Sequence, residues 1–148
     1  IEEELIDPTV SSQIGLRGPL YDKKDSSMSK EVGLFSISGP ELHSMGIEKA
    51  LSLVKDRIGN KLAYLTFDID FVDPAFAPGT GTPEAGGFTG YDALSFVRGL
   101  TEIDFVGFDM VEVMPPYDPA HITSLLAANI IYEFISLIAI QKKMKLNG

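Results

Sequence analysis

The 148-residue sequence contains no cysteine, which excludes disulfide bonds and thiolate metal sites. A reducing cytoplasm is therefore the simplest expectation for its compartment. Basic residues are also scarce, because 12 Lys and Arg stand against 21 Asp and Glu and give a net charge of −9. Since nucleic acids are bound by basic faces, we expect no nucleic-acid partner.

Long hydrophobic runs are missing as well. The longest apolar stretch, residues 130–140, is interrupted by Glu133 and is shorter than the roughly 20 residues that a membrane helix needs. The first residues, IEEELID, are acidic where a targeting segment would be basic. We therefore expect no membrane partner. The length and the 45% hydrophobic content fit one globular domain.

What the sequence does have is a concentration of acids in its middle. Residues 61–120 hold two bases and ten acids, a charge of −8 that is nearly the whole excess. Several of these acids interrupt apolar runs, where solubility does not explain them, and a bound cation would. The ten acids are Asp68, Asp70, Asp73, Glu84, Asp92, Glu102, Asp104, Asp109, Glu112 and Asp118.

Hydrophobic periodicity, bounded by Gly and Pro, predicts strands that alternate with helices. Strands are expected at residues 9–17, 33–38, 62–70 and 104–113, helices at 39–60, 90–100 and 119–143, and a polar surface loop at 18–31. This order favours an α/β protein with a mostly parallel sheet covered by helices. In such sheets the functional groups gather beyond the carboxyl ends of the strands, where Asp68, Asp70 and Glu112 are expected.

The acids of TFDID, residues 66–70, suggest a metal site. Alternate residues of a strand share a face, so Asp68 and Asp70 would stand side by side and either share a proton or bind a cation. Oxygen ligands suit Mg, Ca or Mn. The segment that follows, DPAFAPGTGTP, has little charge and many backbone constraints, and ordered loops of this kind are often functional.

Four motifs carry a resemblance to a known family: TFDID, DPAFAPGTGTPE, GG at 86–87 and VEVMPPYD at 111–118. Together they resemble the C-terminal half of the ureohydrolases, the arginase and agmatinase family, over about residues 8–140. The resemblance implies a three-layer α-β-α fold with a mostly parallel sheet. It also leads us to expect that residues 1–148 are the C-terminal half of a single ureohydrolase domain whose N-terminal half is absent from this sequence.

Within that family the details look most like agmatinase. The segment GTGTPEAGG differs from the arginase pattern, and Gly18 follows Arg17 where arginases carry an acid that helps hold the α-amino group. The resemblance therefore implies hydrolysis of agmatine to putrescine and urea, a step of polyamine biosynthesis. Guanidinobutyrate or another short guanidine is the alternative substrate. Family likeness also implies a homo-oligomer, a trimer or hexamer.

The resemblance also assigns roles to three residues. It implies that Asp68 bridges two Mn ions, that Asp70 binds one of them, and that Glu112 faces the guanidinium of the substrate. Asp68 and Glu112 would thus be the catalytic residues, and the two ions would generate a hydroxide. A carboxylate suits the planar, donor-rich guanidinium, so the residue chemistry of Glu112 agrees.

Histidine is nearly absent, although the family needs a histidine cluster for its metals. This chain has only His43 and His121, neither in such a context, and we expect both to be structural. The expected partner is therefore the N-terminal half of the same enzyme, and the chain alone would be inactive. An alternative of another class is a non-catalytic fragment that only binds a partner.

Three further residues have either a structural interpretation or two alternatives that stay open. Asp73, before Pro74, is expected to be a turn residue. Asp109 is either close to the site or a buried partner for Arg98, with no preference between the two. A structural ion pair is the expected use of Arg17.

Overall fold

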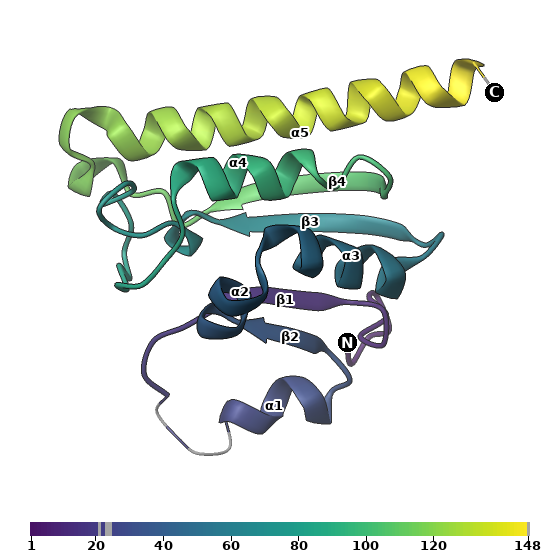
Figure 1. The fold of residues 1–148 in the computed structure, drawn as a ribbon, viewed down its shortest axis with the longest axis horizontal. Coiled ribbons are helices and arrows are strands. Elements are labelled where there is room, and N and C mark those ends of the chain that lie inside the picture. The colour runs from purple at the N-terminus through teal and green to yellow at the C-terminus, as the bar shows by residue number, and fades with distance from the viewer. Residues whose placement is uncertain (21, 23–24, 148) are drawn as a thin grey trace.

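A computed structural model of the chain describes residues 1–20, 22 and 25–147, with parallel strands packed against helices (Figure 1). In chain order the elements are β1 (Ser12–Leu16), α1 (Asp25–Glu31), β2 (Phe35–Ser38), α2 (Gly39–Met45), α3 (Ile47–Ile58), β3 (Leu62–Asp68), α4 (Gly90–Arg98), β4 (Asp104–Val111) and α5 (Ile122–Asn147). Short 3-10 turns occupy Ile69–Phe71, Pro115–Tyr117 and Pro119–His121.

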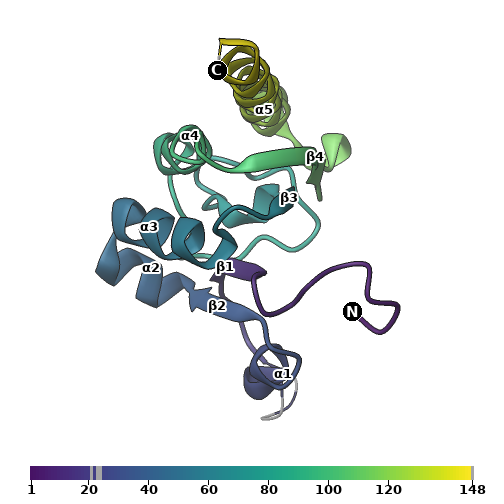
Figure 2. The same ribbon diagram turned by 90° about the vertical axis from the view of Figure 1, so that its right-hand side faces the viewer.

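The strands form two parallel pairs, β1 with β2 and β3 with β4. All four arrows point the same way in Figure 1, with β1 between β2 and β3. Their carboxyl ends therefore lie at one edge of the molecule. The turned view in Figure 2 shows α2, α3 and α4 on the same side of the strands. The predicted α/β architecture with parallel strands is confirmed.

Helix α5 supplies much of the core. Its side chains Ala127, Ile130, Phe134 and Leu137 are buried, and the Phe134 ring lies 4.7 Å from that of Phe108 on β4. The segment Pro119–Leu146 is long and apolar enough to span a membrane, with a mean hydropathy of 1.8. Only 28% of that apolar window is buried, because one stripe of α5 packs on the core while Leu125, Ile131 and Ile135 are exposed.

Several predicted boundaries differ from the structure. The helix expected over 39–60 is two helices, because Gly46 takes a left-handed φ of 81° that ends α2. Ser38 begins α2 with a capping box in which Glu41 is the second member. The loop expected at 18–31 contains α1, and its residues 21, 23 and 24 lie outside the described residues.

Candidate active site

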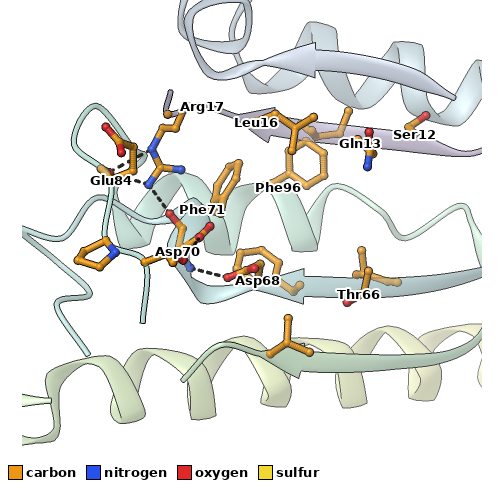
Figure 3. A pocket seen from close by; sticks show the side chains of 18 of the residues that line it. Ser12, Gln13, Leu16, Arg17, Thr66, Asp68, Asp70, Phe71, Glu84 and Phe96 are labelled. Carbon is orange, nitrogen blue, oxygen red and sulfur yellow. Dashed lines mark hydrogen bonds between the residues drawn. The ribbon is translucent and has the colours of Figure 1, made fainter. Parts of the chain in front are cut away.

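Asp68 and Asp70 lie where β3 gives way to a 3-10 turn. Strand β3 ends at Asp68, whose Oδ1 accepts the Asp70 N–H at 2.9 Å and so caps the turn Ile69–Phe71 (Figure 3). The expectation that both acids share one face of a continuous strand is therefore wrong, because the extended backbone stops at Asp68. Both still line the same cavity, since the turn folds Asp70 back beside Asp68. The fully buried Ile69 anchors this turn in the core.

Two side chains hold Asp70 in place. Thr82 Oγ1 donates to Asp70 Oδ2 at 3.2 Å from the loop that follows. Arg17, just beyond β1, donates from Nη2 to the Asp70 carbonyl oxygen. The turn is thus fixed from two sides, and the Asp70 carboxylate keeps a defined position at the cavity.

Arg17 binds backbone carbonyls and forms no ion pair with the residues that the structure describes, which corrects the expectation from sequence. Its Nε lies 3.2 Å and its Nη2 2.9 Å from the Glu84 carbonyl oxygen, and Nη2 lies 3.5 Å from that of Val72 (Figure 3). The guanidinium therefore ties the end of β1 to both ends of the Gly- and Pro-rich loop. Carbonyl binding leaves no trace in a charge pattern, so the sequence could not reveal it.

Glu112 lies one residue beyond β4, which ends at Val111. The expectation of a strand position is wrong, because Glu112 has a left-handed φ of 62°. That conformation is strained for a residue with a side chain, and such strain is typical of functional sites. A Cβ placed on Gly81 would lie 3.6 Å from Glu112 Oε2, so the carboxylate reaches over the loop at a glycine that leaves room for it.

The three carboxylates influence one another. Burial raises the pKa of Asp68, and the negative charges of Asp70 and Glu112 raise it further, while the Asp70 N–H opposes them. Negative charge therefore accumulates at this point. A divalent cation would relieve the repulsion, and the oxygen donors suit Mn or Mg.

The fit to a metal ion is partial. Asp68 and Asp70 offer two carboxylate donors to the cavity, fewer than a binuclear centre needs. Within residues 1–20, 22 and 25–147 there is no group of three or more His, Cys, Asp or Glu that could hold a metal. The donors on this chain thus suit part of a metal site, to which other ligands must be added.

The loop after Asp70 is held by two further aspartates. Asp73 accepts the N–H groups of Ala75, Gly86 and Gly87 at 2.9, 2.9 and 3.0 Å, and the Ala75 N–H is the largest cause of its lowered pKa. The predicted turn role of Asp73 is confirmed. These bonds join the beginning of the loop to its end beside the site.

Asp118 is the loop support that sequence reasoning missed. It is 7% exposed and accepts the N–H groups of Thr123 and Ser124, both at 2.8 Å, at the start of α5. Thr123 Oγ1 in turn accepts the Gly79 N–H at 2.8 Å, which ties α5 to the Gly- and Pro-rich loop. The signal was present, because an aspartate before proline at a helix start is typical of a cap.

Two residues with open interpretations lie away from the cavity. His43 stacks on Phe88 at 4.1 Å and its Nε2 lies 3.0 Å from the Gly86 carbonyl oxygen, so its expected structural role is confirmed. Asp109 accepts the Tyr64 hydroxyl at 2.9 Å. Arg98 pairs with Glu133 on α5 at 2.6 Å, so of the two interpretations left open for Asp109 the structure does not support the pair with Arg98.

Curated relatives of this chain act on guanidino compounds, as their names state. A guanidinopropionase from Pseudomonas aeruginosa is 44% identical over 139 residues, which are 94% of this chain and 44% of that protein. A guanidinobutyrase from the same species is 42% identical and covers 93% and 43%. An agmatinase from Neisseria gonorrhoeae is 44% identical and covers 92% and 42%. The chain thus spans less than half the length of these relatives.

Solved structures share the fold over nearly the whole chain. A hypothetical agmatinase from Burkholderia thailandensis superposes with a TM-score of 0.85 at 40% identity, covering 97% of this chain and 42% of that one. Proclavaminate amidino hydrolase from Streptomyces clavuligerus gives 0.87 at 38% identity and covers 94% and 46%. The model of the arginase family matches residues 1–136, and the chain therefore belongs to the arginase family.

Proposed function

We propose that this chain supplies the aspartate and glutamate part of the active site of a Mn-dependent ureohydrolase, which cleaves a guanidino compound to an amine and urea. The observation that supports this most directly is the convergence of Asp68, Asp70 and Glu112 at the carboxyl ends of β3 and β4. Burial and then the negative charges of Asp70 and Glu112 raise the pKa of Asp68, so a cation would be favoured beside it, and this reaction brings two kinds, the metal and the guanidinium.

The chain's residues divide the work. Asp68 and Asp70 would hold Mn, which supplies the acidity that yields hydroxide from water near neutral pH. Glu112 binds the guanidinium, whose planar N–H groups match a carboxylate, and so orients the guanidino carbon toward the two aspartates. Thr82 and Arg17 keep Asp70 in position. Addition of water to that carbon and loss of the amine leave urea.

Agmatine is the substrate that we propose first. Its two positive ends suit an acidic cavity, and Glu84 adds a carboxylate whose Oε2 would lie 3.4 Å from a Cβ on Gly18. Arg17 is the basic residue that lines this cavity. Its guanidinium already donates to three backbone carbonyls, so we do not expect it to bind a substrate carboxylate. Guanidinobutyrate and guanidinopropionate, which carry a carboxylate tail, remain second because the relatives named for them are equally similar.

Urea release by the Mn-loaded product of the reading frame that contains residues 1–148 tests the activity. We expect kcat/KM to be highest for agmatine, lower for guanidinobutyrate and guanidinopropionate, and much lower for arginine. Equal or faster cleavage of arginine would contradict the agmatine preference. Failure to release urea from any of the four compounds, with Mn bound, would contradict the ureohydrolase proposal itself.

Glu112→Gln in the same protein separates substrate binding from metal binding. The variant keeps the shape but loses the charge, and a charge pair in a closed site contributes roughly 2–5 kcal/mol, so kcat/KM should fall about 100-fold or more. Mn content by elemental analysis should stay unchanged. Glu102→Gln is the matched control, because Glu102 makes only a surface pair with Lys55 at 3.4 Å. A Glu112→Gln enzyme with normal kinetics and a lower melting temperature would remove Glu112 from the site.

A further inference from the structure

Glu84 is an acid of the cavity whose carboxylate has no partner in the described part of the chain. It follows Pro83 in the loop after β3, and it lines the cavity of about 720 Å³ that Asp68 and Asp70 also line (Figure 3). The hydrogen bonds that Glu84 makes within residues 1–20, 22 and 25–147 use its carbonyl oxygen, which accepts from Arg17. The half-buried side chain thus leaves two oxygens to be satisfied by something else.

This feature distinguishes Glu84 from most acids of residues 61–120. Among the described residues, eight of those ten carboxylates meet an N–H, a hydroxyl or a lysine ammonium: Asp68, Asp70, Asp73, Asp92, Glu102, Asp104, Asp109 and Asp118. The two that do not are Glu84 and Glu112. Since Glu112 is the proposed partner of the guanidinium, Glu84 is the acid left for a second cation.

Main-chain contacts hold Glu84 in a fixed place. Its carbonyl oxygen lies 3.2 Å from Arg17 Nε and 2.9 Å from Nη2, and two residues later the Gly86 N–H donates to Asp73 at 2.9 Å. Gly18 follows Arg17 with a left-handed φ of 98°, and a Cβ there would lie 3.4 Å from Glu84 Oε2. The carboxylate therefore lies against a turn that has no side chain, and it is positioned before any ligand arrives.

The distance between Glu84 and Asp70 suits the two ends of a short guanidine. Thr82, which donates to Asp70, is two residues before Glu84, and two residues of extended chain span at most about 7 Å. A butyl chain has a similar length. A guanidine whose head lies beside Asp68 and Asp70 would therefore bring the end of its tail to Glu84. The group that a free carboxylate prefers there is an ammonium, which donates charged hydrogen bonds to it.

We propose that Glu84 binds an ammonium at the tail of the substrate, and so selects guanidines with a cationic tail over those with a neutral or anionic tail. This inference rests on the proposed function, because it takes the guanidinium to lie at Glu112. It adds a specificity-determining residue at the far end of the substrate. The metal and the guanidinium are held by the other three acids, so the charge of Glu84 acts on the tail alone.

Glu84→Gln in the Mn-loaded product of the reading frame that contains residues 1–148 tests the proposal. The substrates are agmatine, butylguanidine and guanidinobutyrate, which differ mainly in the charge at the end of the tail. The ratio of kcat/KM for agmatine to that for butylguanidine should fall about 10-fold or more, mainly through KM, because a charge-assisted hydrogen bond is lost. Guanidinobutyrate should improve relative to butylguanidine, since the repulsion of its carboxylate is removed.

Two further variants separate charge from structure. Glu84→Asp keeps the charge and should retain part of the preference for agmatine. Glu102→Gln removes a surface acid of α4's far end, paired with Lys55 at 3.4 Å, and should keep the ratio of the parent. An equal fall for all three substrates in Glu84→Gln would show that Glu84 only supports the loop, and an unchanged ratio would show that it does not contact the tail. Either result overturns the proposal and leaves the proposed reaction standing.

Calorimetric binding of putrescine and butylamine to the same proteins needs no urea release. The Kd of putrescine should rise about 10-fold in Glu84→Gln, whereas butylamine, which has one ammonium fewer, should show a much smaller change. If the parent binds putrescine in this way but cleaves no guanidine, the proposed reaction fails and the assignment of Glu84 stands. If the affinity for putrescine does not depend on the charge of Glu84, the assignment is overturned.

Discussion

Arg17 organises the acidic site through hydrogen bonds to the main chain. Its guanidinium binds the backbone carbonyls of Asp70, Val72 and Glu84, so it fixes the main chain that carries the site. A planar fork with several N–H groups can serve several acceptors at once, which a lysine ammonium does with less defined geometry. The position of Asp70 thus depends on a residue 53 positions earlier in the chain.

Arg17→Lys tests this role at the residue scale. The charge stays but the fork is lost, so we expect the free energy of unfolding to fall by about 1–3 kcal/mol, since part-buried carbonyls lose charged donors. Urea unfolding of the chain measures the change. Arg98→Lys is the matched control, because Arg98 makes one surface pair with Glu133, and we expect a change below about 1 kcal/mol. Equal losses in the two variants would contradict a special role for Arg17.

The sequence revealed the acids of the site better than their geometry. Asp68, Asp70 and Glu112 stand at expected strand ends and in the motifs that resemble the family, and in the structure the charges of Asp70 and Glu112 act on Asp68. The sequence did not reveal the left-handed backbone conformation of Glu112, because a dihedral angle set by tertiary contacts leaves no local pattern. Nor did it reveal the Thr82–Asp70 bond, which joins residues across a loop. The roles of these residues in metal and substrate binding stay predictions.

At the scale of elements, the start of α5 supports the loop beside the site. Asp118 caps α5 through the N–H groups of Thr123 and Ser124, and Thr123 binds the Gly79 N–H of the loop. Gly79 also packs closely on Asp118, where an added Cβ would approach the Asp118 Cβ to 2.5 Å. The helix start and the loop are therefore one structural unit.

This unit predicts an acid-sensitive step in stability. Burial raises the pKa of Asp118, but hydrogen bonds from Ser124 and Thr123 outweigh it and lower the pKa to about 2, from 3.8. The unfolded chain then binds the proton more readily, so the stabilisation by Asp118 is complete above about pH 4 and is lost as the pH falls toward 2. Asp118→Asn should be less stable than the parent at pH 7 and should lose less stability between pH 4 and 2.

Urea unfolding at several pH values measures this difference. Asp104→Asn is the control, because Asp104 makes an exposed pair with Lys145 at 2.8 Å and lies away from the loop. If the two variants lose the same amount of stability between pH 4 and 2, Asp118 is not the cause of the acid sensitivity.

Element order could be predicted from sequence, but element ends could not. The alternation of apolar strands and amphipathic helices indicated β1 to β4 and α2 to α5, because hydrophobic periodicity is local. The ends of β3 and β4 depend on where the backbone must turn to present Asp68 and Glu112, which tertiary structure decides. Gly46 did offer a local signal for the break between α2 and α3, and the periodic pattern of 39–60 obscured it.

At the scale of the whole molecule, the described residues form two separate strand pairs packed against helices, and they supply only part of the proposed metal site. The two strand pairs stay separate, and the described residues offer Asp68 and Asp70 without a third metal donor in a cluster. The scarcity of histidine in the sequence predicted that this chain lacks part of the expected metal ligands. The sequence could not predict that the two strand pairs are separate, since pairing between distant strands has no local signature. The expected trimer or hexamer stays a prediction.

Because the described residues supply only two carboxylates to the proposed metal site, we predict weak metal binding by residues 1–148 alone. Two carboxylates give a weak site, so after incubation with Mn and dialysis we expect well under one ion per chain by elemental analysis. Chelation should leave the melting temperature unchanged, because an ion that is held weakly adds little to the free energy of unfolding. A non-catalytic fragment that only binds a partner would behave in the same way. The assay must therefore include a fusion in which the part of the Neisseria gonorrhoeae agmatinase outside the match is joined to residues 1–148.

Mn binding by that fusion distinguishes a ureohydrolase from a non-catalytic fragment that only binds a partner. A ureohydrolase should retain about two Mn ions per chain. If Asp68 holds both ions and Asp70 one, as the family resemblance implies, Asp68→Ala should lose both and Asp70→Ala mainly one. Asp92→Ala is the control, because Asp92 caps α4 with Thr89 away from the cavity and should keep both ions. A fusion that folds but never retains Mn would favour the partner-binding class. Two tightly held ions on residues 1–148 alone would instead contradict the incomplete site, because the donors would then all have to lie on this chain.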